Sequence, residues 1–243
     1  RRFLKDSLEF IRNSFPDYEI VPFGITRGYS PDYDLPYDES SSQARMEFCH
    51  GGIWWAYRFG QSSQAPKNDI PNISIMANRD RLEITLNAEL HPSQVVLQRR
   101  IRSAPEIFNS ILYAHGGLWL NMYLKYEHLP RFYHWIPCLW KPPGGFDAGT
   151  IIAEYKLRSE QFEEDRDYWI NRIIENNKEL SAEQISHLRQ KTKNLNLATR
   201  LAHQLKAADS FWREPYEEQL KHVIGSVVKL RPLVDFFVGD TTR

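Results

Sequence analysis

The fold is decided by the stretch ISIMANRDRLEITLN, which covers residues 73–87. Two apolar runs, residues 73–76 and 82–87, flank the polar sequence Asn-Arg-Asp. In the second run apolar residues alternate with polar ones, and this period of two is typical of a strand that turns one face to a core. The apolar members of that run are Leu82, Ile84 and Leu86. The stretch therefore predicts a β-hairpin.

Two further hairpin-like units lie outside this one. The first joins residues 44–49 to residues 53–59 through His-Gly-Gly, a turn that glycine makes easy. Its second run places one set of apolar side chains on a common face: Ile53, Trp55, Tyr57 and Phe59. The other unit joins residues 132–140 to residues 150–157 through a loop rich in Pro and Gly. Three such units predict a largely antiparallel, or mixed, sheet.

Helical patterns surround the strands in the first part of the chain. Residues 1–15 carry apolar residues at near-helical spacing and predict an amphipathic N-terminal helix. A second helix is expected to begin at Ser103-Ala-Pro-Glu106, which has the form of a capping box, and Gly116-Gly117 is expected either to bend it or to end it. We expect it to turn three apolar side chains inward: Ile107, Ile111 and Leu112. Between the first helix and the first hairpin, residues 18–42 predict a long acidic loop.

The last third of the sequence is expected to be helical. Residues 159–177 form a charged helical pattern, Ser181-Ala-Glu-Gln184 has the form of a second capping box, and Tyr216 begins an apolar stripe. Strands followed by grouped helices favour an α+β fold. We expect residues 1–157 to form the sheet-containing core, and residues 158–243 to form a helical region packed on it within one continuous domain.

Composition excludes several classes of protein. The chain has 243 residues, and its 31 Lys and Arg balance its 31 Asp and Glu, so any basic surface must be local. The two cysteines, Cys49 and Cys138, support neither a disulfide scaffold nor a zinc site made of thiolates, and a reducing, cytoplasmic location is expected. No apolar run is long enough to span a bilayer, which favours a soluble protein without a membrane partner. The phosphate-binding glycine motifs are absent from the sequence.

One short constellation could carry chemistry. On a strand over residues 150–157, Glu154 and Lys156 would project from the same face, and Asp147 precedes that strand at a turn. Two carboxylates, Asp147 and Glu154, could hold Mg²⁺, while Lys156 helps to orient or deprotonate a water for attack on a phosphodiester. The pattern resembles the PD-(D/E)xK nuclease core, with Phe146-Asp147 in place of the usual Pro-Asp. The resemblance implies a magnesium-dependent nuclease as an alternative function.

The favoured function is binding rather than catalysis. Arg99, Arg100 and Arg102 form a basic cluster, and aromatic residues such as Trp54 and Trp135 could stack on bases. Phosphate neutralisation and base stacking are the two needs of a single-stranded nucleic-acid site. We therefore expect a binding domain with nucleic acid as its ligand and no required cofactor, within a larger protein or complex. A scaffold that binds a protein partner or self-associates is a further alternative.

Histidines give a weaker signal. The sequence His-Gly-Gly occurs twice, at His50 and at His115, and His134 precedes Cys138 in the same expected strand. Neither H-E-x-x-H nor C-x-x-C is present, so no zinc site is expected. Histidines next to glycine turns are most often structural, and this is the role we expect for both.

Overall fold

The computed structural model describes residues 2–24, 53–61, 71–77, 81–89, 91–125, 135–176, 178, 180–206 and 213–239. These residues form one sheet with the strand order β1-β2-β3-β4-β7-β5-β6, in which neighbouring strands are antiparallel. The strands are β1 (Tyr18–Gly24), β2 (Ile53–Gln61), β3 (Asn72–Ala77), β4 (Arg81–Ala88), β5 (Leu118–Lys125), β6 (Trp135–Lys141) and β7 (Leu197–Lys206). The helices are α1 (Arg2–Ser14), α3 (His91–Ser103), α4 (Pro105–His115), α5 (Ala148–Asn176), α6 (Ala182–Lys191), α8 (Tyr216–Lys229) and α9 (Arg231–Val238). The predicted α+β class with its antiparallel sheet, N-terminal helix and C-terminal helices is confirmed.

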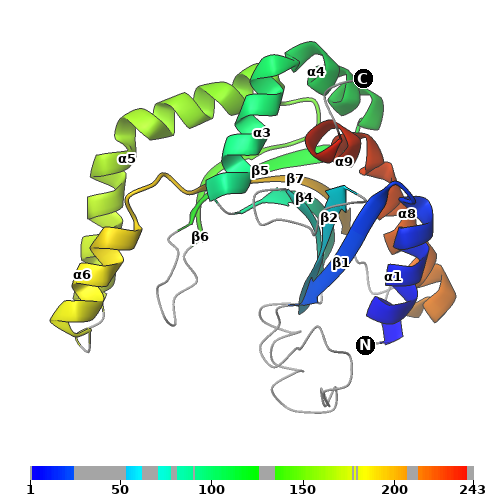
Figure 1. Ribbon diagram of the computed structural model, residues 1–243, viewed down its shortest axis with the longest axis horizontal. Helices are drawn as coiled ribbons and strands as arrows, with labels where there is room; N and C mark the ends of the chain where they lie inside the picture. The colour runs from blue at the N-terminus through cyan, green and yellow to red at the C-terminus, as the bar shows by residue number, and fades with distance from the viewer. Residues whose placement is uncertain are drawn as a thin grey trace.

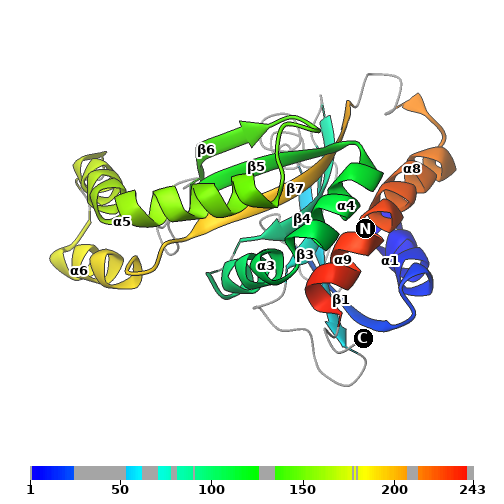
Figure 2. The same ribbon diagram turned by 90° about the horizontal axis from the view of Figure 1, so that it is seen from above.

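Helices cover one side of this sheet. In Figure 1, α3, α4, α5 and α9 lie over the sheet, while α1 and α8 lie beside each other at its right-hand end. Figure 2 shows α6 at the far end of α5, away from α1 and α8. The buried core lies between the sheet and the helices, and it includes Phe59, Ile84 and Leu201 from strands and Leu97, Phe108 and Phe237 from helices. None of the described helices combines the length and the apolar character that a membrane span requires.

The predicted hairpin over residues 73–87 is confirmed as β3 and β4. Ile75 lies opposite Ile84, and both side chains are fully buried in the core. On the other face of the same hairpin, the hydroxyl groups of Ser74 and Thr85 form a hydrogen bond of 2.6 Å. The alternation of the sequence therefore separates an apolar face from a polar one, as expected for a period of two.

The predicted loop over residues 18–42 is wrong at its beginning, because residues 18–24 form strand β1. Pro22 is tolerated there because β1 is an edge strand, which leaves one side of its backbone without a ladder partner. Strand β2 pairs with β1 on one side and with β3 on the other. The other predicted partner of β2, residues 44–49, lies outside the described residues.

The third predicted hairpin is also wrong. Residues 150–157 belong to helix α5, and β6 pairs instead with β5. The helix begins after Asp147, whose Oδ1 accepts hydrogen bonds from the backbone N–H and from the hydroxyl group of Thr150. Ile151, Tyr155 and Phe162 are buried at helical spacing. A local N-cap and this spacing favour a helix where apolar alternation alone suggested a strand.

A strand that the sequence analysis missed lies near the middle of the sheet. Strand β7 pairs with β4 on one side and with β5 on the other. Its residues 197–199 are buried irrespective of the face on which they lie, so the strand lacks the clean alternation that marked β4. Residue 157 itself lies inside α5, so the two predicted regions share this helix as well as the sheet.

The start of α4 differs from the predicted capping box. The N-cap is Ala104, which makes no side-chain bond, and the hydroxyl group of Ser103 donates to the carbonyl of Arg100 instead. Phe108 is fully buried, whereas Ile107, which was expected to turn inward, is 58% exposed. The helix ends rather than bends at Gly116, which adopts a left-handed conformation with φ of 65°. The second capping box, Ser181 with Gln184, is confirmed.

Candidate functional site

The three residues of the nuclease hypothesis do not form a metal site. Glu154 and Lys156 lie on α5, where residues two apart point about 200° away from each other around the helix axis. The Glu154 carboxylate forms a 2.8 Å ion pair with Arg158, and Lys156 is exposed. Asp147 lies about 10 Å from Glu154 along the helix axis, at about 1.5 Å per residue. This donor set does not fit Mg²⁺.

Asp147 has a structural role at the start of α5. The hydrogen bonds from Thr150 hold the pKa of the Asp147 carboxyl below its ordinary value, because they stabilise the ionised form. The Asn109 side chain of α4 supports the same helix end by accepting a 2.8 Å hydrogen bond from the backbone N–H of Ala148. Among the described residues, no group of three or more His, Cys, Asp and Glu side chains could hold a metal ion.

The predicted nucleic-acid residues are spread over the molecule. Arg99, Arg100 and Arg102 lie on α3, where Arg100 donates a 2.8 Å hydrogen bond to the carbonyl of Gly239 and so ties α3 to the end of α9. Arg102 contacts Gln98 of its own helix, and Arg99 is exposed.

The two predicted aromatic platforms are far apart. Trp54 belongs to β2 and Trp135 to β6, and these strands are separated by about 24 Å across the sheet, at about 4.8 Å for each strand spacing. Their side chains lie outside the described residues. The structure therefore does not bring the predicted binding residues together.

A groove along α4 gives a more compact candidate site. Its cavity has a volume of about 650 Å³. One face of α4 forms a wall, because residues three and four apart on a helix share a face. The remaining wall comes from three other elements: His203 of β7, Lys229 of α8 and Pro232 of α9. The α4 residues that line it are Glu106, Ile107, Ser110, Ile111, Ala114 and His115. We call this feature the α4 groove.

Two histidines meet at one end of the α4 groove. The rings of His115 and His203 lie edge to face, with centroids 5.6 Å apart. His203 reaches this place because it shares a face of the sheet with its register partners Ile84 and Leu118, which are part of the core. Within the described part of the chain, three ring nitrogens of this pair are buried and have no hydrogen-bond partner. They are Nδ1 and Nε2 of His115 and Nδ1 of His203.

Burial keeps this histidine pair neutral. Desolvation lowers the pKa of both rings below 6.5, because it disfavours the charged imidazolium. The positive charge of the nearby Lys229 lowers both pKa values further, and the ring of His203 does the same to His115. At neutral pH, each uncharged ring carries one N–H donor and one nitrogen acceptor.

Charge is distributed unevenly along the α4 groove. Lys229 is exposed at the C-terminus of α8, and its ammonium group forms no ion pair with the described residues. Glu106 lies in the first turn of α4, about 13 Å from His115 along the helix axis. Between these ends the lining is mainly apolar, with Ile107, Ile111 and Pro232. The groove thus has a basic end, an apolar middle and an acidic end.

A second polar cluster lies on the opposite face of the sheet. The guanidinium of Arg200 on β7 lies 3.7 Å from the carboxylate of Glu83 and 3.3 Å from that of Glu89. It also lies over the ring of Tyr123, at 5.6 Å from the centroid. Arg200 is flanked in the register by Asn87 of β4 and Asn121 of β5. Both asparagines are fully buried.

This cluster has the character of a structural network. Glu83 is buried, Glu89 and Arg200 are partly buried, and all three are paired, which is the arrangement that the interior of a protein tolerates. The side chain of Asn121 makes no hydrogen bond to the described residues.

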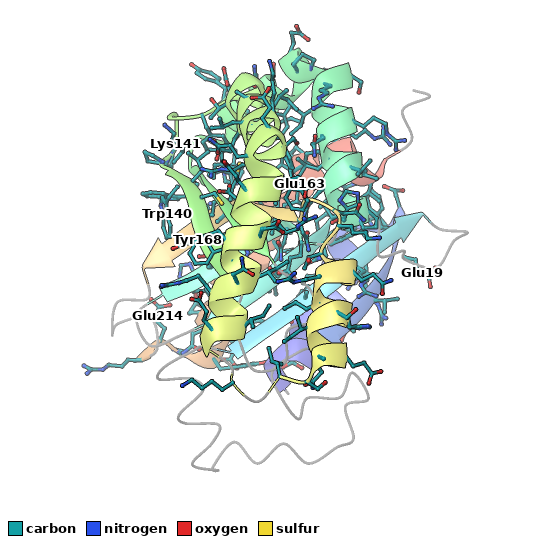
Figure 3. All side chains as sticks on the ribbon, turned by 90° about the vertical axis from the view of Figure 1, so that its left-hand side faces the viewer. Glu19, Trp140, Lys141, Glu163, Tyr168 and Glu214 are labelled. Carbon is teal, nitrogen blue, oxygen red and sulfur yellow. The ribbon has the colours of Figure 1, made fainter. Side chains whose placement is uncertain are left out.

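Charged and aromatic side chains also occupy the outer surface of α5. Figure 3 shows this helix and α6 toward the viewer, with Glu163 and Tyr168 labelled on α5. Tyr168 packs edge to face on Trp169 while remaining 54% exposed. Arg166 forms ion pairs with Glu163 and Asp167. Over its whole length α5 carries seven acidic and four basic residues, so this helix has a net negative charge.

Sequence analysis found only part of the α4 groove. His115 was identified through its His-Gly-Gly sequence, but as a structural residue. His203 and Lys229 were missed, since His203 lies on the unpredicted strand β7. Three comparisons of this chain, with protein-family models, with curated proteins and with solved structures, gave no match. The assignment of a site therefore rests on the geometry of the chain itself.

Proposed function

We propose that this protein is a binding domain whose ligand is a small molecule with an apolar body, held in the α4 groove. The observation that carries the proposal is the cavity itself. It joins apolar side chains to a convergent pair of histidines and an ammonium group. Small-molecule sites are usually concave and mainly apolar, with volumes of about 300 to 1,000 Å³ and a few polar groups that fix the ligand.

The exposure of Ile107 supports this proposal. An isoleucine side chain that is 58% exposed on a helix beside a cavity leaves apolar surface in contact with water. Covering such a side chain with a ligand contributes about 1 to 2 kcal/mol to the free energy of binding, at about 25 cal/mol for each Å² of apolar surface. Covering Ile111, which is partly buried, adds a smaller contribution, and the ligand's own immobilisation opposes both.

The test uses an uncharged naphthylamine dye whose fluorescence increases in apolar surroundings. We expect saturable binding by the wild-type protein, and at least about tenfold weaker binding by Ile107→Asp, because a carboxylate in the groove disfavours an apolar body. Leu157→Asp is the matched control, since Leu157 is an exposed apolar residue on α5 that does not line the groove. Absence of saturable binding, or equal weakening by both substitutions, contradicts the proposal.

The other predicted functions rest on the sequence alone. Nucleic-acid binding is still a prediction, supported by the exposure of Arg99 and Arg102 on α3. The nuclease hypothesis stays a prediction as well, although Glu154 and Lys156 lie on helix α5 rather than on the expected strand. A cytoplasmic location and a role as a protein scaffold likewise stay predictions.

A further inference from the structure

At the basic end of the α4 groove, no carboxylate of the described residues pairs with Lys229. Lys229 brings a positive charge next to two imidazole rings, and all three side chains line the same cavity. Neighbouring basic side chains form ion pairs outside the groove. Arg231 on α9 contacts Asp17 and Asp235. Lys221 on α8 contacts Glu218. Among the described residues that line the groove, Glu106 is the only one with a carboxylate, and it lies at the far end of α4.

The chemistry of this end selects the charge of a ligand. Neutral imidazoles can donate N–H groups and an ammonium group supplies charge, which are the contacts that a carboxylate or a phosphate ester accepts. Within the described part of the chain, both nitrogens of His115 are buried without a hydrogen-bond partner. Nδ1 of His203 is buried in the same way, so the polar atoms that a head group can reach at this end are Nε2 of His203 and the ammonium group of Lys229.

We propose that the ligand of the α4 groove is an amphiphilic anion, whose head group lies against His115, His203 and Lys229 and whose apolar chain lies along Ile107 and Ile111. This inference rests on the proposed function, because it assumes that the groove takes a ligand. The apolar path from the histidines toward Glu106 is about 13 Å long. It matches a chain of about eight to ten carbon atoms, at roughly 1.3 Å for each carbon in an extended chain and allowing for the head group.

Isothermal titration calorimetry with four ligands of one chain length tests the head group. The ligands are octanoate, octyl phosphate, octanol and octylammonium. We expect both anions to bind at least about tenfold more tightly than octanol, and octylammonium to bind no better than octanol, because its charge is repelled at the basic end. The ratio of octanoate to octyl phosphate distinguishes the two anionic sources of the same chemistry.

Substitutions assign this preference to the basic end. Lys229→Gln is expected to reduce the affinity for octanoate to within about threefold of that for octanol, and to leave octanol binding unchanged. Lys193→Gln is the matched control, because Lys193 is an exposed lysine that does not line the groove. Equal affinities for octanoate and octanol in the wild type overturn this inference, whereas the proposed groove stands as long as both bind.

Three other outcomes are also decisive. Failure of all four ligands to bind, with dye binding retained, contradicts the anionic amphiphile but not the groove. A dimer in light scattering that Ile107→Asp dissociates contradicts both proposals, because the groove would then be an interface between two copies of the chain. Preservation of octanoate preference in Lys229→Gln would likewise overturn the assigned role of Lys229.

Discussion

His115 of α4 and His203 of β7 lie edge to face, with their ring planes at 67° and their centroids 5.6 Å apart. This contact joins the helical layer to the sheet at the end of the α4 groove. Both rings are half-buried, and the nearby ammonium group of Lys229 disfavours a positive charge on either. A neutral histidine pair thus lies where an anionic head group would be received.

The stability of the protein should depend on the charge of this pair. Because the pKa of both rings is lower in the folded state than the ordinary 6.5, the unfolded state binds protons first as pH falls below 6.5. The free energy of unfolding should therefore have its full value above pH 6.5 and decrease as the pH falls below 6.5. Urea unfolding across this window measures the effect. The double variant His115→Gln/His203→Gln should show a shallower decrease, and an unchanged slope contradicts the lowered pKa values.

Ligand binding should show the opposite dependence on pH. An anionic head group favours the protonated imidazoles, so its affinity should increase as pH falls below 6.5, while the ligand stays ionised. The groups that line the groove from α4, β7 and α8 are Glu106, His115, His203 and Lys229, and α9 adds only Pro232. Octanol supplies the control, since its affinity should change little. Identical pH profiles for octanoate and octanol would count against the histidine contact.

The polar cluster on the other face of the sheet should matter for stability. Replacing Arg200 by Met removes the cation from beside Glu83, whose side chain is buried, and should destabilise the fold by about 3 kcal/mol. The exposed substitution Arg99→Met is the control, with an expected change within about 0.5 kcal/mol. Denaturant unfolding measures both. A loss below about 1 kcal/mol for Arg200→Met would mean that Glu83 is not dependent on this partner.

Asp147 separates the structural interpretation from the nuclease hypothesis. Asp147 is the N-cap of α5, so the Asp147→Ala substitution should lower the free energy of unfolding by about 1 kcal/mol. The Asp147→Asn substitution should lower it less, because the amide oxygen can still accept hydrogen bonds from Thr150. Added Mg²⁺ should leave the melting temperature of the wild type unchanged. A magnesium-dependent stabilisation that is present in the wild type and lost in Asp147→Asn would restore a metal role for this carboxylate.

Nucleic-acid binding can be tested on α3. If single-stranded DNA binds through the predicted basic cluster, the double variant Arg99→Ala/Arg102→Ala should reduce the salt dependence of the affinity by about 1.4 in log–log slope, at about 0.7 for each phosphate contact. Arg100→Ala should instead reduce stability, because its guanidinium bonds to Gly239. Fluorescence anisotropy at several salt concentrations gives the slope. Binding that does not depend on salt concentration, or the absence of any binding, would contradict the prediction.

Local patterns in the sequence predicted the parts of the fold that local interactions determine. The β3–β4 hairpin follows from the alternation around Ile84, and the start of α6 follows from the capping box of Ser181. Strand β7 was not predicted because it lies between two other strands, and residues on both of its faces, such as Leu197 and Ala198, are buried. Residues 150–157 alternate like a strand, yet the N-cap at Asp147 makes them helical.

The candidate site depends on two features of the fold that were not predicted from the sequence, strand β7 and the orientation of α4. His115 and His203 meet only because β7 pairs with β5, a contact between segments far apart in the chain. The exposure of Ile107 follows from the register of α4, in which Phe108 rather than its neighbour enters the core. Without β7 and this register, the sequence alone offers two unrelated histidines and an apolar helix.

The most direct test of the central claim is a crystal structure of the protein grown with octanoate. The carboxylate is expected within hydrogen-bond distance of a ring nitrogen of the histidine pair or of the Lys229 ammonium group, with its chain along Ile107 and Ile111. Octanoate located at another surface, or reversed so that its carboxylate lies beside Glu106, would contradict the account.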